Sequence, residues 1–355
     1  MRNNKVLLGM SGGVDSCMAA ILLKESGYEV VGATLSTCLP AAEDPAIEDA
    51  KSFCQMVGIK HHVIKSRGEF KRQVMDYFAE SYLHGYTPNP CIRCNKTIKW
   101  PYLLEAARKY GCRYVGTGHY VGIEWYQNRF YLKKGVDPAK DQSYFLWNLP
   151  QDVLDHALFP LGQYLKSDIM QLAVDYGLPE LPQRRESNGV CFLSGNDYSQ
   201  FLQRHIPSDH VALQPGLVID HQGNHFGTHQ GFAYYTLGQR KGLTPVLPAQ
   251  WCVVHIDVQQ NILIVGPREM LNLTEVLLFD YELTPDASLW ENQSVFIRIR
   301  GLDAVPGYVG TVEITNEGLL VQFSQPVWAI TPGQSIVIYQ NDLVIGGGEV
   351  PDYFQ

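Results

Sequence analysis

The chain has 355 residues, of which 45% are hydrophobic and 18% are charged, and its formal net charge is −8. This length predicts two or three domains, and the composition is ordinary for a globular protein. No run of about 18 apolar residues occurs, so a membrane-spanning helix is not expected. The eight scattered cysteines are too few for a disulfide scaffold, and residues 1–5 leave no room for a signal peptide. We therefore expect a reducing, cytoplasmic location.

The charge is unevenly distributed along the chain. Residues 51–113 contain twelve Lys or Arg and four Asp or Glu, a local net charge of +8. Residues 201–355 contain six basic and fifteen acidic residues, a net charge of −9. A basic segment in an acidic chain predicts one face that binds a polyanion such as a nucleic acid. A solvated helix surface would explain the same segment, and charge alone favours that plainer explanation.

The first expected elements are a buried strand over residues 6–10 and a helix over residues 17–24. A glycine loop joins them, Ser11-Gly12-Gly13-Val14-Asp15-Ser16. The glycines allow a tight turn and a close approach to a ligand, and the N–H groups and dipole of a helix start bind phosphate. Ser11 and Ser16 add hydroxyl donors, and Asp15 suits a position near Mg²⁺. The loop contains no Gly-Lys-Ser/Thr, so it is not a Walker loop.

Strands and helices then alternate as far as residue 116. We expect strands at 28–35, 60–64 and 113–116, and helices at 44–57, 69–83 and 95–110. This alternation predicts an α/β fold with a doubly wound parallel sheet, in which the ligand lies beyond the carboxyl ends of the strands. The glycine loop has that position, and so does the stretch Gly116–Tyr120. A hairpin over residues 121–134 follows.

The pattern changes in the second half of the chain. The last expected helices are at 166–176 and 197–205, and short β runs separated by glycine and proline turns follow from about residue 207. We expect strands at 251–257, 261–265, 294–300, 310–314, 319–323 and 335–340. This organisation predicts a catalytic domain at 1–205, a small β-rich central domain at 206–269 and a C-terminal β-barrel at 270–355.

Two cysteines, Cys91 and Cys94, lie at the end of a loop that Pro88 and Pro90 keep out of a helix. Cys94 is expected near the start of the helix over residues 95–110. A helix start and nearby cations lower a thiol pKa, which favours a nucleophile or a metal ligand. A lone Cys-x-x-Cys is also compatible with a thioredoxin-like centre or with zinc, but structural zinc is not favoured, because no second Cys-x-x-Cys exists.

The other cysteines divide into three groups. Cys17, Cys54 and Cys112 lie in apolar contexts and are expected to be buried small hydrophobes. Cys191 lies on a polar, glycine-containing loop that begins near residue 184, and the sequence does not place it beside Cys94. Cys38 and Cys252 remain unassigned.

Taken together, the ordered motifs resemble those of the bacterial tRNA-specific 2-thiouridylases, which belong to the ATP pyrophosphatase superfamily. The resemblance extends nearly from end to end. It is carried by Gly9–Ser16, Thr87–Pro90, Cys94–Lys96, Gly118–Tyr120, Lys140–Leu146, Gly189–Phe192, Tyr234–Gly242 and Thr331–Ser335.

The resemblance implies an adenine nucleotide alpha hydrolase-like fold and an enzyme that 2-thiolates the wobble uridine, position 34, of tRNAs for Lys, Glu and Gln. ATP and Mg²⁺ are the implied cofactors. The implied partners are tRNA and a persulfide sulfur-donor protein, with no membrane and no DNA. The residues implied to hold ATP are Gly9, Met10, Ser11, Gly12, Gly13, Val14, Asp15, Ser16, Leu35 and Gly118. Asn89, Pro90 and Cys91 would meet the target base, and His119, Lys140, Asp141, Gln142, Arg298, Ile299 and Gln334 would contact tRNA.

The implied mechanism uses Cys191 as the persulfide carrier and Cys94 as the nucleophile that releases sulfur, which leaves a Cys94–Cys191 disulfide. The chain departs from the family at Cys91, where much of the family has Asp. Three thiolates, those of Cys91, Cys94 and Cys191, would also suit a 4Fe-4S cluster with one open iron. The remaining alternatives are another adenylating ligase with the same loop and a non-catalytic iron–sulfur or RNA-binding module. The first leaves Cys94, Cys191 and the basic segment unexplained, and the intact glycine loop argues against the second.

Overall fold

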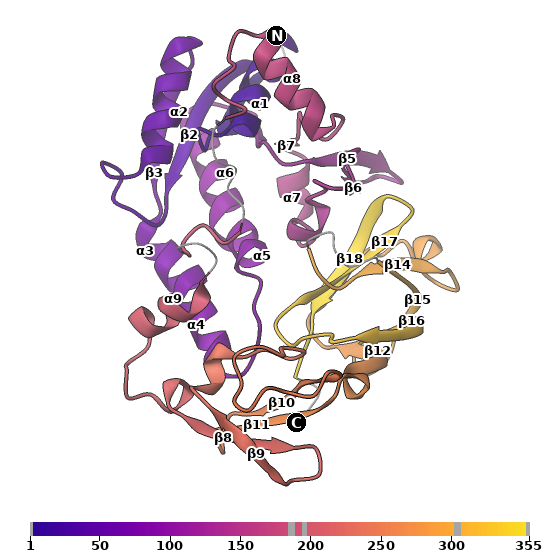
Figure 1. The fold of residues 1–355 in the computed structure, drawn as a ribbon. Coiled ribbons are helices and arrows are strands. Elements are labelled where there is room, and N and C mark those ends of the chain that lie inside the picture. The colour runs from indigo at the N-terminus through magenta and orange to yellow at the C-terminus, as the bar shows by residue number, and fades with distance from the viewer. Residues whose placement is uncertain (1–2, 184–188, 194–196, 302–306, 353–355) are drawn as a thin grey trace. The chain divides into compact units, whose positions relative to one another are not determined.

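The computed structural model describes residues 3–183, 189–193, 197–301 and 307–352. The chain forms two compact units, each built from segments that are distant in sequence (Figure 1). Unit 1 comprises Met1–Val74, Cys91–Cys191 and Asp342–Val344. Unit 2 comprises Met75–Pro90, Phe192–Asn341 and Ile345–Gln355. None of the described helices is long and apolar enough to cross a membrane.

Unit 1 is built on a parallel sheet of five strands in the order β3-β2-β1-β4-β7. These strands are β1 (Lys5–Gly9), β2 (Glu29–Ser36), β3 (Lys60–Lys65), β4 (Tyr114–Gly116) and β7 (Ala157–Leu158). The predicted doubly wound sheet is confirmed. The edge strand β7 was not predicted, because two residues are too few to show a strand pattern.

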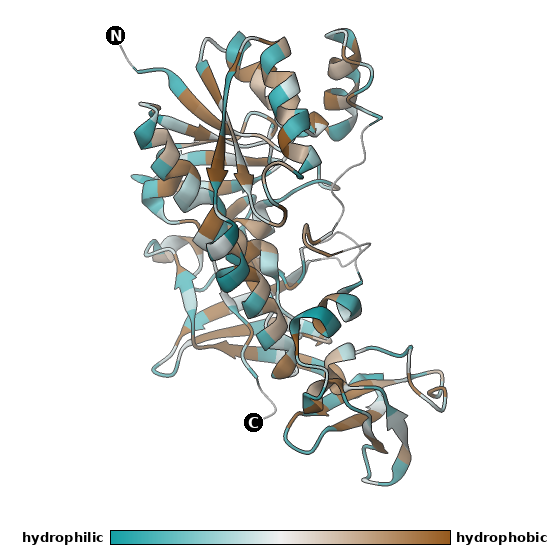
Figure 2. Ribbon diagram, turned by 90° about the vertical axis from the view of Figure 1, so that its left-hand side faces the viewer, coloured by the Kyte–Doolittle hydropathy of each residue, from teal (hydrophilic) through white to brown (hydrophobic). Residues whose placement is uncertain are grey.

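Helices cover both faces of this sheet. Val6 and Leu8 of β1 are fully buried in one cluster with α1 (Val14–Glu25), α2 (Pro45–Met56) and α8 (Lys166–Asp175). Side chains alternate along a strand, so the buried Leu7 lies on the opposite face. The helix α6 (Trp100–Lys109) packs on β1, where Leu103 lies next to Gly9. The strands β1 and β2 are rich in hydrophobic residues, as expected for strands covered on both faces (Figure 2). The edge strand β3 is more polar and more exposed.

Cys94 does not lie near a helix start, so this part of the prediction is wrong. A short helix, α5 (Pro90–Cys94), begins at Pro90 and runs through a π-helical turn (Asn95–Lys99) into α6. Proline is favoured in the first turn of a helix because that turn leaves its N–H groups unpaired. Pro90 therefore starts the helix, and Cys94 lies inside it.

The helix predicted over residues 69–83 is also divided. It consists of α3 (Arg67–Phe70), a π-helical turn (Lys71–Met75) and α4 (Asp76–Leu83). The predicted hairpin is confirmed as β5 (Val121–Tyr126) and β6 (Arg129–Lys134), with a tight turn in which Gln127 and Asn128 have φ of 45° and 66°. A further short helix in unit 1, α7 (Gln151–Leu154), was not predicted.

The centre of unit 2 is a sheet with the strand order β10-β11-β8-β9. Its strands are β8 (Gly216–Asp220), β9 (His225–His229), β10 (Trp251–Asp257) and β11 (Ile262–Pro267). The helices α4 and α9 (Tyr198–His205) share a hydrophobic core with it, in which Phe78, Phe201 and Phe232 are buried. The predicted small β-rich domain is confirmed, although β8 and β9 were not predicted individually.

The rest of unit 2 is an antiparallel β structure that matches the predicted C-terminal barrel. Its strand order is β12-β16-β15-β14-β17-β18, and β13 pairs with β18. The strands are β12 (Asn272–Leu278), β13 (Tyr281–Leu283), β14 (Val295–Arg298), β15 (Tyr308–Ile314), β16 (Leu319–Trp328), β17 (Ser335–Gln340) and β18 (Leu343–Glu349).

Candidate active site

The strand order of unit 1 reverses between β1 and β4, because the chain moves outward through β2 and β3 on one side and through β4 and β7 on the other. Such a reversal leaves a crevice at the carboxyl ends of the two central strands, where ligands bind. The glycine loop follows β1, and Thr117-Gly118-His119 follows β4. The topology therefore brings both predicted stretches to one point.

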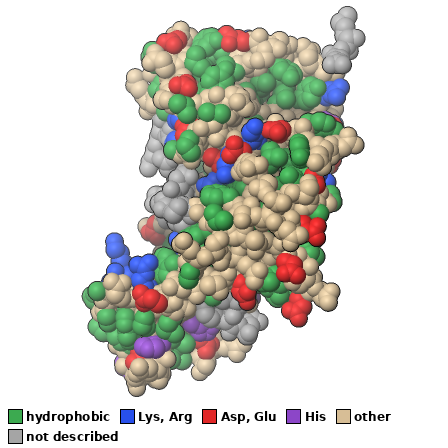
Figure 3. Space-filling view, turned by 90° about the vertical axis from the view of Figure 1, so that its right-hand side faces the viewer, with side chains coloured by type: hydrophobic (Ala, Val, Ile, Leu, Met, Phe, Trp, Pro, Cys, Tyr) green, Lys and Arg blue, Asp and Glu red, His purple; other side chains and the backbone are tan. Residues whose placement is uncertain are grey.

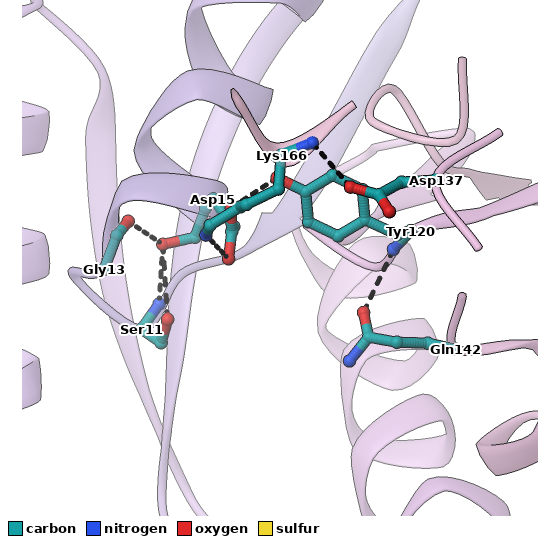
Figure 4. A network of polar contacts seen from close by, with 8 residues as sticks. Ser11, Gly13, Asp15, Tyr120, Asp137, Gln142 and Lys166 are labelled. Atoms are coloured by element: carbon teal, nitrogen blue, oxygen red, sulfur yellow. Dashed lines mark hydrogen bonds and ion pairs between the residues drawn. The ribbon is translucent and has the colours of Figure 1, made fainter. Parts of the chain in front are cut away.

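The conformation of the glycine loop depends on close backbone packing and on hydrogen bonds within the loop. Gly12 has φ of +74°, and a Cβ there would lie 2.6 Å from the Cβ of Asp49. Ser16 Oγ donates to the carbonyl of Gly13 at 3.1 Å and accepts from the N–H of Ser11 at 3.2 Å (Figure 4). Gly13 is the N-cap of α1 and provides no side-chain cap. The loop thus ends in a helix start suited to binding a phosphate.

Gly118 lies against this loop. A Cβ at Gly118 would lie 3.0 Å from the carbonyl carbon of Asp15 and 3.0 Å from the backbone N of Ser16. These are backbone atoms at the start of α1, so they cannot move aside cheaply. Leu35, which is also predicted to hold ATP, is half-buried near the carboxyl end of the adjacent strand β2.

Asp15 is held by two side chains from later parts of the chain. Lys166 Nζ lies 2.7 and 2.8 Å from its two carboxylate oxygens, and the hydroxyl of Tyr120 donates to it at 2.7 Å (Figure 4). The side chain of Lys166 is only 10% exposed, so solvent screens this ion pair weakly. Lys166 is the site residue that sequence reasoning missed, because no motif marks it and 151 residues separate it from Asp15.

His119 is held as a neutral imidazole. Its Nε2 lies 3.5 Å from Lys99 Nζ, and its Nδ1 lies 2.7 Å from the hydroxyl of Thr117. A lysine can only donate, so Nε2 accepts and the proton is on Nδ1. Burial and the Lys99 charge hold the pKa of His119 well below its usual value. His119 is therefore uncharged at neutral pH and can interact with a ligand through hydrogen bonding or stacking, not as a cation.

Asp141 and Gln142 support the loop in which they lie. The carboxylate of Asp141 is buried and accepts from the N–H of Gly135 and from both the N–H and hydroxyl of Ser143. Gln142 exchanges hydrogen bonds of 3.0 Å with the backbone of Tyr120. These contacts hold Tyr120 beside Asp15. The neighbouring Lys140 is half-buried.

The thiols of Cys91 and Cys94 differ from the sequence-based expectation. Burial raises the pKa of Cys91, and burial raises the pKa of Cys94 to about 11 against the lowering effect of the Lys99 charge. We expected a lowered pKa for Cys94, and this was wrong because Cys94 lies inside a helix and desolvation outweighs the nearby cation. Cys17, Cys54 and Cys112 are buried, as predicted.

Cys191 is exposed and its sulfur lies 4.0 Å from that of Cys38, with which it shares a hydrogen bond. The preceding residues 184–188, which the sequence places on the same loop, lie outside the described residues. The charges of Cys94 and Cys91 also contribute to raising the pKa of Cys191. Unit 1 therefore contains the thiols of Cys38, Cys91, Cys94 and Cys191. Within the described ranges, no three His, Cys, Asp or Glu side chains are arranged to hold a metal ion.

In unit 2, Gln334 holds the loop before Cys91. Its amide donates to the carbonyl of Thr87 at 2.6 Å, and the Thr87 hydroxyl lies 2.6 Å from that of Thr236. The motifs around Thr236 and Gln334 thus meet at the Thr87–Pro90 loop. Within this loop Asn89 is half-buried and Pro90 is buried.

Two other residues predicted to contact tRNA lie at the end of β14. Arg298 is half-buried and donates to the carbonyl of Gly301 at 3.3 Å. Ile299 is only 3% exposed, so its side chain cannot provide much contact surface.

The basic residues of the segment 51–113 all lie in unit 1, and eleven of the twelve are exposed, Lys99 being half-buried. A hollow of about 450 Å³ near the carboxyl ends of β2 and β3 is lined by Ser36, Ser66, Lys65 and Arg67, among others. On the face drawn in Figure 3, Lys and Arg side chains are interspersed with Asp and Glu. The exposed basic segment is thus available to a polyanion, although exposure alone also fits a solvated surface.

Three family models match the chain in succession. They are described as a tRNA methyl transferase HUP domain over residues 4–195, a tRNA methyl transferase PRC-barrel domain over residues 199–267 and an aminomethyltransferase beta-barrel domain over residues 274–350.

Curated relatives match the chain over nearly its whole length. A tRNA-specific 2-thiouridylase from Caldanaerobacter subterraneus subsp. tengcongensis is 42% identical over 98% of this chain and 97% of its own. Proteins with the same name from Clostridium acetobutylicum and Natranaerobius thermophilus are 39% and 40% identical, with coverage of 98% or more of each chain. Among solved structures, a U34-tRNA thiolase from Methanococcus maripaludis with its 4Fe-4S cluster aligns with 59% of this chain and 69% of its own. That alignment has 17% identity and a TM-score of 0.36, which is too weak to support an argument about chemistry.

Proposed function

Because the chain belongs to the family of tRNA-specific 2-thiouridylases, we propose that it activates a tRNA uridine at the glycine loop and replaces the C2 oxygen through Cys94 and Cys191. The chain is a tRNA sulfurtransferase, and its fold and family fit the use of ATP. We propose the wobble uridine of tRNAs for Lys, Glu and Gln as its substrate. We also propose a cytoplasmic location and a persulfide protein as sulfur donor.

The observation that carries this proposal is the position of the glycine loop, at the sheet reversal and with Gly118 packed against the start of α1. The pyrophosphate of ATP would bind at this helix start. The uridine C2 oxygen attacks the α-phosphate, pyrophosphate leaves, and the oxygen becomes part of a good leaving group. Mg²⁺, when bound with ATP, neutralises phosphate charge, and Asp15 is the acidic residue of the loop that could hold it. Asp15 would then have to exchange Lys166 for the ion.

Sulfur transfer follows the adenylation in our proposal. The terminal sulfur of a persulfide on Cys191 bonds to C2 as AMP leaves with the old oxygen. The Cys94 thiolate then attacks the Cys191 sulfur, which releases 2-thiouridine and leaves a Cys94–Cys191 disulfide. The exposure of Cys191 supports its role as the residue that receives sulfur from another protein. Cys94 and Cys191 belong to the same compact unit, which is compatible with their pairing.

We propose this persulfide route rather than a route through a 4Fe-4S cluster on Cys91, Cys94 and Cys191. The described side chains do not fit a cluster, because no three His, Cys, Asp or Glu among them converge as metal ligands would. The thiol next to Cys191 is that of Cys38, at 4.0 Å. Cys91, which is half-buried, is left to meet the target base, as we also propose for Asn89.

Gln334, His119, Lys140, Asp141, Gln142, Arg298 and Ile299 are proposed to act in tRNA binding. The contacts of Gln334, Asp141 and Gln142 support roles in holding loops that face the substrate. We also propose residues 1–205 as the catalytic domain, 206–269 as the central domain and 270–355 as the barrel domain.

The decisive experiment measures 2-thiouridine in tRNA from a strain that lacks its own 2-thiouridylase and expresses this chain. The chain is expected to restore 2-thiouridine, and Cys94→Ala and Cys191→Ala are expected to abolish it, while Cys112→Ala retains it. The purified protein should convert ATP to AMP and pyrophosphate when tRNA is present. Release of ADP, or full activity of Cys94→Ala, would contradict the proposed mechanism.

A further inference from the structure

Cys38 is a thiol that the proposed function does not use. It lies just after β2, at the carboxyl edge of the sheet where the glycine loop also begins. Its sulfur is 4.0 Å from that of Cys191, although 153 residues separate them in sequence. A disulfide requires Cα atoms within about 7 Å and sulfurs that can close to bonding distance, and a contact of this kind needs little movement.

Cys38 also differs from the other site thiols in its ionisation. The hydrogen bond from Cys191 lowers the pKa of Cys38 to about 7, and the Thr37 hydroxyl acts in the same direction, against burial and the charge of Asp44. The pKa of Cys94 is raised to about 11 by burial, and the pKa of Cys191 is raised by its hydrogen bond to Cys38. This hydrogen bond exists only while Cys191 is a free thiol, so for attack on a Cys191 disulfide the relevant observation is the 4.0 Å contact between the two sulfurs. The attacking form in thiol–disulfide exchange is the thiolate.

We propose that Cys38 is the resolving thiol of this enzyme, which attacks the Cys191 sulfur of the Cys94–Cys191 disulfide after sulfur transfer. This inference rests on the proposed persulfide mechanism and adds a step to it. It gives a role to the 4.0 Å contact between Cys38 and Cys191, because the proposed persulfide mechanism pairs Cys191 only with Cys94.

The exchange is balanced without a further reactant. The Cys38 thiolate forms a bond to the Cys191 sulfur, the Cys94–Cys191 bond breaks, and the electron pair leaves with Cys94. Cys94 then takes up a proton, which its pKa of about 11 favours at neutral pH. Cys94 is then free, and the remaining disulfide joins Cys38 to Cys191. Both of these residues are accessible, Cys38 being half-buried and Cys191 exposed. A dithiol reductant can therefore reach this disulfide and complete the cycle.

The test follows a single turnover of persulfide-loaded enzyme with tRNA and ATP in the absence of reductant. After an acid quench, free thiols are alkylated, disulfide-linked peptides are identified by mass spectrometry, and 2-thiouridine is quantified. The unmodified chain is expected to end with a Cys38–Cys191 disulfide and an alkylated Cys94. Cys38→Ser is expected to form 2-thiouridine in the first turnover and to end with a Cys94–Cys191 disulfide. Cys112→Ala, which removes a buried thiol elsewhere in unit 1, should behave like the unmodified chain.

Repeated turnover with a dithiol reductant gives a second measurement. Cys38→Ser should slow the steady-state rate about tenfold, the equivalent of about 1.4 kcal/mol in barrier height. The inference is overturned if the unmodified chain ends with a Cys94–Cys191 disulfide, if Cys38→Ser cycles at the normal rate, or if folded Cys38→Ser cannot make 2-thiouridine even once. Failure of the proposed function is recognised separately, by an unmodified chain that makes no 2-thiouridine or by a Cys94→Ala variant that still does.

Discussion

Lys166 places a cation beside a loop whose only charged residue is Asp15. The pair is mostly shielded from water, and the Tyr120 hydroxyl donates a further hydrogen bond to the carboxylate. In the proposed reaction ATP brings negative phosphates to this loop. Those phosphates would compete with Asp15 for Lys166. We therefore expect the Lys166–Asp15 ion pair to stabilise the loop mainly before the nucleotide binds.

Replacing Lys166 by Ala is therefore expected to destabilise unit 1. It leaves the Asp15 carboxylate without its cation in a partly buried place, which should lower the free energy of unfolding by about 2 kcal/mol. Denaturant unfolding followed by circular dichroism would measure the change. The exposed Lys96→Ala should alter it by no more than about 0.5 kcal/mol. Equal stability of the two variants would show that the ion pair contributes nothing measurable.

The ionisation of Cys38 can be tested directly through its reactivity. Only the thiolate is alkylated, and because the pKa is lowered to about 7, the rate of Cys38 alkylation should rise with pH through 7 and level off above it. Cys94, with a pKa raised to about 11, should react slowly and continue to accelerate beyond pH 9. Iodoacetamide labelling with peptide mass spectrometry would give both profiles. Cys191→Ser should move the Cys38 profile to higher pH if the thiol–thiol hydrogen bond is the main cause.

The segment around Pro90 shows how one short element sets the surroundings of a site residue. The sequence predicted a proline-broken loop before Cys91, because two prolines interrupt the helical pattern. In the structure Pro90 instead begins α5, which places the half-buried Cys94 within a helix. A proline that interrupts a helix and a proline in the first turn of a helix look the same in the local sequence. Only the packing of the folded chain distinguishes them.

Gly118 connects the two segments that follow β1 and β4, and its substitution gives a sharp test. A Cβ at Gly118 would lie 3.0 Å from backbone atoms of Asp15 and Ser16, so Gly118→Ala should displace the start of α1. The KM for ATP in tRNA-dependent pyrophosphate release is expected to rise about tenfold. Gly68→Ala is the matched control, because a Cβ there meets nothing within 4 Å, and it should leave KM unchanged. An unaltered KM in Gly118→Ala would remove the glycine loop from the proposed nucleotide site.

At the scale of the whole molecule, the sequence predicted what local patterns encode. Alternating apolar runs and glycine stops predicted the parallel sheet, and the glycine loop predicted a phosphate site at its edge. The contacts of Lys166 with Asp15 and of Cys38 with Cys191 span 151 and 153 residues, and no local pattern specifies such distant pairs. Short strands such as β9, which contains two histidines and a glycine, also lack the alternation that identifies a strand.

Charge distribution is a property of the whole chain, and it leads to a prediction about tRNA binding. If the basic segment of unit 1 contacts RNA phosphates, affinity should fall steeply with salt, because each contact releases counterions. The double variant Arg67→Glu/Lys96→Glu removes two exposed cations and should reduce the slope of log affinity against log salt by about two. Lys99 is left intact because it contacts His119.

The matched control reverses two exposed cations, Arg204 and Lys241, in the acidic part of the chain. The control changes the net charge by the same amount, so a general effect of net charge would alter both variants alike. Filter binding of tRNA across a range of salt concentrations is expected to separate them, with the slope reduced only in the variant of unit 1. If the two slopes agree, the basic segment is a solvated surface, and the tRNA phosphates must be bound by other residues.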